Sequence, residues 1–124
     1  MKRTIVAVLL LMAFAPAQAE WVRVSQIRDS VYYIDQATIR KNGHLRRVWV
    51  LQDLRKRHQD GELSRRLLME YDCKGERMRN LSISEHLAPM ASGQAMSTDS
   101  TPEPWVSIPR NTPAEVIFKI ICAK

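Results

Sequence analysis

The sequence predicts an α+β fold in which an antiparallel β-sheet meander carries a C-terminal α-helix. Short runs of β-prone residues separated by turn residues extend from Trp21 to Ser84, and strands joined by short connections favour antiparallel pairing. An amphipathic segment with a helix-start motif begins at Thr112. The two cysteines of the chain, Cys73 and Cys122, end a predicted strand and the predicted helix, so a disulfide is expected to tie the helix to the sheet.

Residues 1–19 have the pattern of a cleaved signal peptide. Lys2 and Arg3 form a positive start, an apolar run follows over residues 5–15, and Ala17-Gln18-Ala19 is a small-x-small cleavage motif. The apolar run is shorter than the roughly 20 residues that span a bilayer. We therefore expect export, cleavage after Ala19, no membrane span and a single domain over residues 20–124.

The expected mature domain is small and mildly basic. Loss of Lys2 and Arg3 leaves 17 of the 19 basic side chains against 13 acidic ones, a formal charge of +4. About a hundred residues suit one modest core. In an oxidising compartment the two cysteines are expected to pair, and closing a loop of about fifty residues stabilises a fold by about 4 kcal/mol. A redox or metal site is the alternative, but the pair is not CxxC and has no His at ligand spacing.

Five strands are expected before the helix. Their predicted ranges are 21–26, 30–34, 45–54, 64–73 and 76–84. The third is apolar on both faces at Val48-Trp49-Val50-Leu51, which is typical of a central strand. The fourth alternates, and its core face is expected to carry Leu67, Met69, Tyr71 and Cys73.

The connections are predicted from local chemistry. Asp35 is expected to cap a single helical turn that ends at Ile39, and Asn42-Gly43 to form a turn with positive φ. Residues 88–104 are rich in Ser, Thr, Gly, Met and Pro and have no sustained apolar period. We expect a long surface loop there.

The C-terminal segment predicts a helix. Thr112 is a hydroxyl cap, Pro113 occupies the first helical position, and Glu115 is placed to reach back to the start. Apolar residues then recur at helical spacing, at Ala114, Ile117, Phe118, Ile121 and Cys122. A final strand is the alternative, because four residues of the segment are β-branched.

No residue cluster predicts catalysis. His44, His58 and His86 are scattered, so each is expected at the surface without a metal or acid-base role. Glu70 and Asp72 share a strand face and could act as paired carboxylates, but a salt-linked surface is expected instead. Arginines on neighbouring strands are placed to pair with them, namely Arg65, Arg66, Arg77 and Arg79. The sequence contains no glycine-rich phosphate loop and no GxSxG elbow. We expect no enzyme activity, no catalytic residue, no metal and no cofactor.

A basic segment at a predicted hairpin tip is the candidate ligand-binding site. Arg55, Lys56 and Arg57 are its candidate contact residues, and such a tip attracts sulfated glycans, acidic lipid head groups or nucleic acid through charge. A solvated turn is the alternative, because nearby acidic residues partly neutralise the tip. Nucleic acid is not expected as a partner, because no row of aromatic residues accompanies the charges. The tryptophans are expected in core and edge packing, at Trp21, Trp49 and Trp105.

The order of motifs resembles the surface-adhesin protein E family. The motifs that carry the resemblance are Trp21, Tyr33-Ile34-Asp35 with Thr38-Ile39, Val48-Trp49, Tyr71-Asp72-Cys73, and Trp105 before a terminal helix ending in Cys122. The resemblance covers nearly all of residues 20–124. It implies an antiparallel sheet with a helix tied to it by the cysteine pair, a homodimer formed through the sheet, and binding of host extracellular-matrix proteins such as vitronectin and laminin.

Two functional hypotheses follow from different classes of protein. The first is an exported, non-catalytic binding domain of the adhesin type, with a protein or acidic glycan as partner, acting in secreted form or at the cell surface. The second is a periplasmic accessory protein that associates with itself or with an envelope partner through a sheet edge. The sequence departs from an anchored adhesin because no cysteine follows the predicted cleavage point to accept a lipid.

Overall fold

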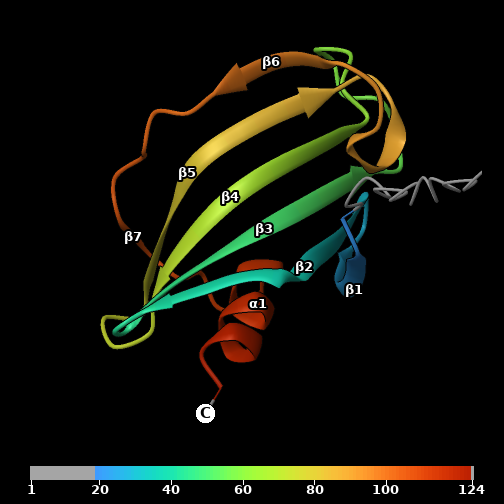
Figure 1. The fold of residues 1–124 in the computed structure, drawn as a ribbon. Coiled ribbons are helices and arrows are strands. Elements are labelled where there is room, and N and C mark those ends of the chain that lie inside the picture. The colour runs from blue at the N-terminus through green and yellow to red at the C-terminus, as the bar shows by residue number, and fades with distance from the viewer. Residues whose placement is uncertain (1–18, 124) are drawn as a thin grey trace, which may run out of the picture.

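The architecture is a meandering antiparallel sheet with one helix packed against it (Figure 1). The computed structural model describes residues 19–123. Six strands lie side by side in chain order, so β1 and β6 form the two edges. Their bounds are β1 Trp21–Ile27, β2 Ser30–Asn42, β3 Leu45–Leu54, β4 Ser64–Asp72, β5 Arg77–His86 and β6 Ala95–Asp99. The short strand β7 (Val106–Ser107) pairs with the opposite end of β5 from β6. The predicted fold class is confirmed.

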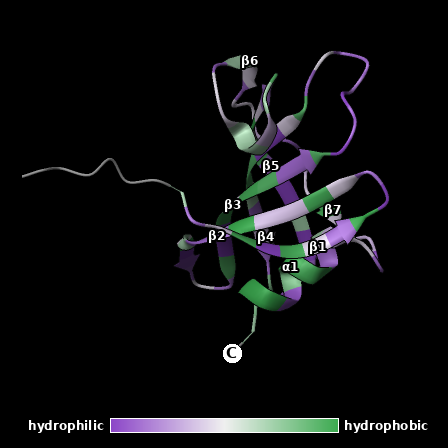
Figure 2. Cartoon of the chain, turned by 90° about the vertical axis from the view of Figure 1, so that its right-hand side faces the viewer, coloured by the Kyte–Doolittle hydropathy of each residue, from purple (hydrophilic) through white to green (hydrophobic). Residues whose placement is uncertain are grey.

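The helix α1 (Pro113–Ile121) begins as its sequence motif predicts. The Thr112 hydroxyl accepts a hydrogen bond from the Glu115 amide, and the Glu115 carboxylate accepts one from the Asn111 amide. Ile117 and Ile121 are buried against the sheet, and much of the visible helix is hydrophobic (Figure 2). The alternative of a final strand is wrong, because the capped start and the period of 3.6 outweigh the β-branched residues.

One core lies between α1 and the sheet. Its buried members are Ile34, Val48, Val50, Met69, Tyr71, Ile117 and Ile121. The Tyr71 hydroxyl donates to the Ala114 carbonyl oxygen over 3.1 Å, so even the polar atom of this side chain contacts the helix. Burial raises the pKa of Tyr71 above its ordinary value. Two residues after Tyr71, the disulfide Cys73–Cys122 joins the end of β4 to the end of α1, with the Cα atoms 5.6 Å apart.

The expected helical turn after Asp35 is wrong. Residues 35–39 belong to β2, where the pairing register with β3 shifts between Asp35 and Arg40. Asp35 does accept a hydrogen bond from the Ala37 amide, and the Thr38 hydroxyl donates to the Asp35 carbonyl oxygen and accepts from the Trp49 amide of β3. The local bend predicted from Asp35 is therefore present, but the sheet absorbs it as a bulge.

The expected long loop over residues 88–104 is partly wrong. It contains the short 3-10 helix η1 (Pro89–Ala91) and strand β6. All five side chains of β6 are exposed, so an edge strand of this kind shows no apolar alternation in the sequence. The Asn42-Gly43 turn is present, with Gly43 at a φ of 59°.

The predicted signal peptide falls almost entirely on residues 1–18, which lie outside the described part of the chain. Within the described residues, α1 is too short to cross a membrane, and no other helix is long and apolar enough to do so.

Candidate binding surface

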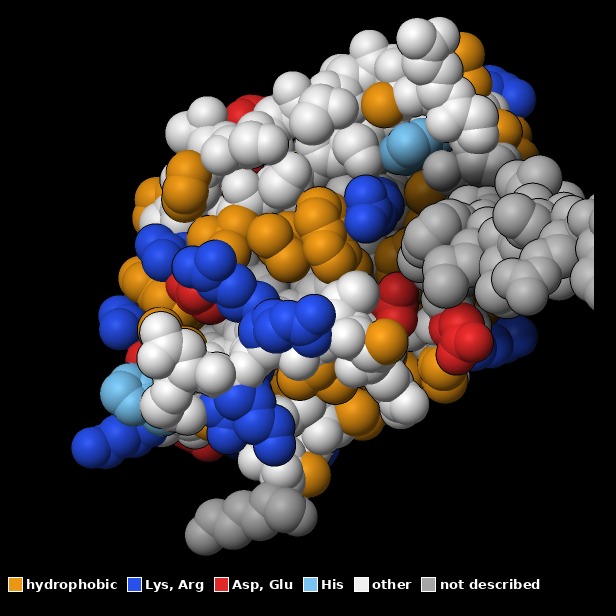
Figure 3. All heavy atoms as spheres, in the orientation of Figure 1, with side chains coloured by type: hydrophobic (Ala, Val, Ile, Leu, Met, Phe, Trp, Pro, Cys, Tyr) orange, Lys and Arg blue, Asp and Glu red, His pale blue; other side chains and the backbone are white. Residues whose placement is uncertain are grey.

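The face of the sheet opposite α1 is covered at one end and open at the other. At the covered end η1 is held on the sheet, because the Met90 amide donates to Asp53 and the Ala91 amide donates to Ser64. Leu51 and Ser64 lie beneath it and are fully buried. We call the remainder, towards the β2–β3 turn, the open face. In the view of Figure 3, Lys and Arg side chains gather around this turn, and hydrophobic side chains cross the middle of the surface.

A buried carboxylate holds two arginines on the open face. Arg47, Glu70 and Arg79 are directly opposite one another on β3, β4 and β5. Arg47 Nε lies 2.7 Å from one Glu70 oxygen, and Arg79 Nε lies 2.9 Å from the other. Burial raises the pKa of Glu70, but the hydrogen bonds from both guanidinium groups outweigh it, so the net pKa is below the ordinary range. Glu70 is therefore a charged anchor beneath two arginines.

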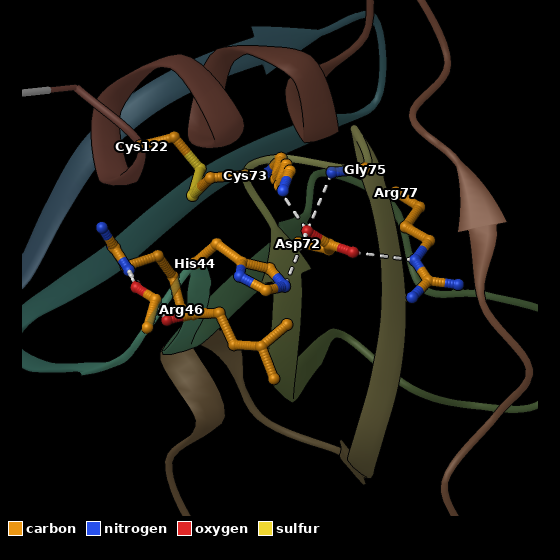
Figure 4. A network of polar contacts seen from close by, with 10 residues as sticks. His44, Arg46, Asp72, Cys73, Gly75, Arg77 and Cys122 are labelled. Atoms are coloured by element: carbon orange, nitrogen blue, oxygen red, sulfur yellow. Dashed lines mark hydrogen bonds and ion pairs between the residues drawn. A yellow bond between two sulfur atoms is a disulfide. The ribbon is translucent and has the colours of Figure 1, made fainter.

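Asp72 anchors a third arginine one row further along the strand (Figure 4). Its carboxylate accepts hydrogen bonds from the amides of Lys74 and Gly75 at 3.1 and 2.8 Å and from Arg77 Nε at 2.9 Å. The bond from Gly75 is the main cause that lowers the pKa of Asp72, with Arg77 adding to it against the effect of burial. A Cβ at position 75 would lie 2.6 Å from an Asp72 oxygen, so any larger residue there would displace the carboxylate.

The pairing predicted for Glu70 and Asp72 is therefore correct for Arg79 and Arg77, while their expected surface position is wrong. Both carboxylates are buried. Arg65 instead pairs with Glu62, and Arg47, for which no pairing with Glu70 was predicted, completes the pair of arginines on Glu70. Strand register decides these partners, and sequence spacing on one strand does not reveal it.

Two tryptophans of the open face lie under guanidinium groups. Arg66 is stacked 3.9 Å above the centre of the Trp49 ring. Arg77 and Arg79 lie 4.6 and 4.5 Å from the centre of the Trp105 ring. Both indoles are half-buried. Each indole thus fixes the plane of an arginine that itself remains partly in solvent.

The predicted basic tip lies at the other end of the sheet. Arg55, Lys56 and Arg57 are all exposed in the connection between β3 and β4, and we call residues 55–63 the basic loop. Arg57 donates to the carbonyl oxygens of Gly61 at 2.6 Å and Leu87 at 3.0 Å, so it also holds the loop together. Beside the loop is a shallow hollow of about 580 Å³, lined partly by Lys56 and Arg57.

A group with metal-ligand residue types occurs in the same loop. His58 Nδ1 lies 3.6 Å from Asp60 and 3.3 Å from Glu62, a proximity that the sequence analysis did not predict. Glu62 is fully buried, and Arg65 donates to both of its oxygens, which lowers the pKa of Glu62. The guanidinium already uses the carboxylate that a cation would need, so the group forms a salt-linked loop anchor.

The histidines differ from the expectation at one position. His44 and His58 are exposed as predicted, but His86 is buried under the covered end of the face. Its Nε2 lies 2.9 Å from the Ser84 hydroxyl, and within residues 19–123 its Nδ1 has no hydrogen-bond partner. A catalytic Ser-His pair normally has a carboxylate on Nδ1 that orients the ring. No described residue fills that role here.

The geometry defines a class of protein: a small, disulfide-closed sheet domain whose features for contact are an open charged face and a basic loop. The model of the family described as surface-adhesin protein E matches residues 21–123. The chain belongs to this family, which consists of surface adhesins, a non-enzyme kind of protein. Membership implies an adhesin-like binding domain in an exported or cell-surface protein.

Solved structures of Haemophilus influenzae protein E share the fold. Crystal form II matches with a TM-score of 0.69 and 15% identity over 86% of this chain and 90% of that chain. A second structure matches with a TM-score of 0.66 at 15% identity, covering 86% of each chain. Protein E from a non-typeable strain matches with a TM-score of 0.60 at 16% identity, covering 86% of this chain and 78% of that one. The search of curated proteins finds no match.

Proposed function

We propose that this chain is an exported, non-catalytic adhesion domain that binds host extracellular-matrix proteins, with Arg55 and Lys56 of the basic loop as first contacts. The observation that carries the proposal is the exposure of adjacent cations at a sheet end in a chain of a surface-adhesin family. Arg55 and Lys56 make no side-chain hydrogen bond to another described residue, so both charges are free to meet an acidic partner.

The loop that presents these cations is rigid enough to keep them together. Backbone hydrogen bonds close it from Leu54 to Leu63 and from His58 to Glu62, each at 2.9 Å. The Arg55 amide also donates to the Asp29 carbonyl oxygen of the β1–β2 turn at 2.9 Å. Because the loop is ordered before binding, Arg55 and Lys56 lose less conformational entropy when a partner binds.

Binding of the exported chain to immobilised vitronectin and laminin tests the proposal. The variant Arg55→Glu/Lys56→Glu is expected to lower the association rate at least about tenfold at low salt, because charge reversal removes electrostatic steering. The control Arg110→Glu/Lys119→Glu makes the same change of charge near α1 and should bind nearly as the parent does. Unchanged binding of the loop variant to every matrix protein would overturn the proposal.

An exposed sheet edge supports a second candidate function, association through β6. This strand ends the sheet, and its five side chains are all exposed. An unpaired edge is a template for another strand, from a second copy or an envelope partner in the periplasm. Light scattering over a range of concentrations tests it: a rise in mass that Thr98→Pro abolishes is expected, and a monomer at every concentration contradicts self-association.

A further inference from the structure

Four arginines of the open face lie in two neighbouring rows of residues that are paired across the strands. The basic loop is not part of either row. Arg40, Arg47, Glu70 and Arg79 are consecutive Cα partners across β2, β3, β4 and β5, and Arg77 stands opposite Asp72 in the next row. Adjacent strands are about 4.8 Å apart, so the first row extends over about 14 Å. We call Arg40, Arg47, Arg77 and Arg79 the arginine patch. It lies at the end of the sheet that contains the β2–β3 turn, where Figure 3 shows Lys and Arg side chains gathered.

The patch presents positive charge outward and keeps its negative charge beneath. The side chains of Arg47 and Arg77 are 54% and 47% exposed, whereas those of Glu70 and Asp72 are only 2% and 6% exposed. Four arginines against two carboxylates leave a net charge of +2. Arg40 has no acidic partner among residues 19–123 and instead donates to the carbonyl oxygens of Ala37 and Ile39.

The row also contains an arrangement that folding alone disfavours. Arg40 and Arg47 are directly opposite on neighbouring strands, where like charges destabilise a sheet. Asn42, Leu45 and Glu70 line a recess of about 260 Å³ with these two arginines. A bound anionic group between the two guanidinium groups would relieve the repulsion.

The arginines are held in place and still have unused hydrogen-bond donors. Arg47 and Arg77 each use Nε for the hydrogen bond to the buried carboxylate, and their terminal amino groups donate to no other described residue. Trp105 fixes the planes of Arg77 and Arg79. A guanidinium with a free edge recognises the paired oxygens of a sulfate or carboxylate bidentately.

The shape of the patch selects among anions. Its cations are spread along a line on an open surface, which suits a linear polyanion better than a single small anion that needs converging donors. Trp49 and Trp105 are already covered by guanidinium groups, so neither offers a bare ring for a nucleobase to stack on. We propose that the arginine patch binds a sulfated glycan chain that lies across β2 to β5, with each sulfate held by one or two arginines.

Heparin is the probe for the test, with the exported chain purified in its disulfide-bonded form. Arg40→Gln is expected to lower the affinity about tenfold, as for loss of a charge-assisted hydrogen bond, and to reduce the salt dependence of binding. Lys41→Gln is the matched control: it removes the same charge from the next residue, whose side chain points to the other face. Equal affinities of the Arg40 and Lys41 variants would overturn the proposal.

A second variant separates the geometry of the patch from net charge. Arg47→Gln/Glu70→Gln removes one charge of each sign, so the net charge of the chain is unchanged. The proposal expects weaker heparin binding, and binding equal to that of the parent contradicts it. Thermal unfolding of both variants checks that each is folded. If the double variant does not fold, Arg40→Gln alone tests the proposal.

Competing ligands distinguish the sources of negative charge. Desulfated heparin is expected to bind more weakly than heparin. Equal binding of polyglutamate would assign the patch to acidic protein segments instead, and equal binding to vesicles of phosphatidylglycerol and phosphatidylethanolamine would assign it to a lipid surface. Heparin binding through the patch should respond to Arg40→Gln and not to Lys41→Gln, whereas matrix-protein binding through the basic loop should respond to Arg55→Glu/Lys56→Glu, so failure of one and failure of the other are separate results.

Discussion

The two ends of the sheet present positive charge in different ways. At one end, the basic loop displays three consecutive cations, of which Arg57 is also used to hold the loop to Gly61 and Leu87. At the other end, the arginine patch collects cations from three strands, β2, β3 and β5, and holds three of them on two buried carboxylates of β4. A consecutive run is visible in the sequence, whereas the patch exists only once the strands are in register. The arginine patch, which no run of residues in the sequence reveals, therefore has more of its cations held by ion pairs than the basic loop has.

Loss of the disulfide should lower the stability of the fold more than any other change, and the loss should be greatest at the end of the sheet that carries the arginine patch. Cys73 directly follows Asp72, and its amide donates to the His44 carbonyl oxygen at 2.9 Å. Cys73→Ser/Cys122→Ser is expected to lower the free energy of unfolding by about 4 kcal/mol. Hydrogen exchange should accelerate more at Gly75 than at Gly61. Equal acceleration at both ends would show that the bridge stabilises the sheet as a whole.

Removal of the carboxylate anchor should have the next largest effect. Glu70→Ala frees two arginines and is expected to lower the free energy of unfolding by about 2 kcal/mol, less than for a fully buried pair because both arginines are partly in solvent. Glu62→Ala is the counterpart in the basic loop, where it frees one arginine, Arg65, and removes the contact to His58. Urea denaturation should rank Glu70→Ala as the more destabilising change, and the reverse order would contradict the comparison.

Substitution of one glycine tests the Asp72 cradle. Gly75→Ala places a Cβ 2.6 Å from the Asp72 carboxylate and is expected to cost about 1 kcal/mol by weakening its hydrogen bonds. Thermal denaturation measures the loss. Gly93→Ala, away from the patch, measures for comparison the cost of an alanine at a φ of 73°, where the strain comes from the backbone and not from a side-chain contact. If only Gly93→Ala lowers the unfolding temperature, the close approach at position 75 does not matter.

The smallest effect expected is a difference in acid sensitivity. A carboxyl with a lowered pKa in the folded chain stabilises the fold above its unfolded pKa, about 4, and that stability is lost as the pH falls through the folded pKa. Glu62 and Glu70 both have lowered pKa values. Stability should therefore be flat from pH 7 to about pH 5 and fall below about pH 4. The fall should be shallower in Glu70→Gln, and an identical pH profile would contradict this.

Much of the fold was predictable because its determinants are local. The bounds of β3 agree with the expected 45–54, and α1 starts after the predicted Thr112 cap. The two wrong elements, the helical turn after Asp35 and the continuous loop over residues 88–104, are places where the sheet overrides local preference. In β2 the ladder absorbs the bend as a bulge, and in β6 backbone pairing to β5 forms a strand whose side chains all face solvent.

Of the two candidate surfaces, the sequence predicted the basic loop but not the arginine patch, because only the loop is formed by neighbouring residues. The basic loop needed only neighbouring residues, so Arg55, Lys56 and Arg57 could be nominated directly. The row of Arg40 and Arg47 with Glu70 and Arg79 could not be predicted, because only the pairing of β2 to β5 brings these residues together. Burial of Glu62 and His86 was also missed, since both depend on how the β3–β4 connection and η1 fold over the sheet.

The sequence by itself determined the class of fold, the cysteine pair and the helix cap. Alternation, turn chemistry and capping act within a few residues, and the chain has two cysteines, so one pairing is possible. Only the tertiary structure decided which carboxylates are buried, which arginines share them and which half of the sheet stays open. Those outcomes depend on register, and a shift of one residue would exchange every side chain between the covered and the open face.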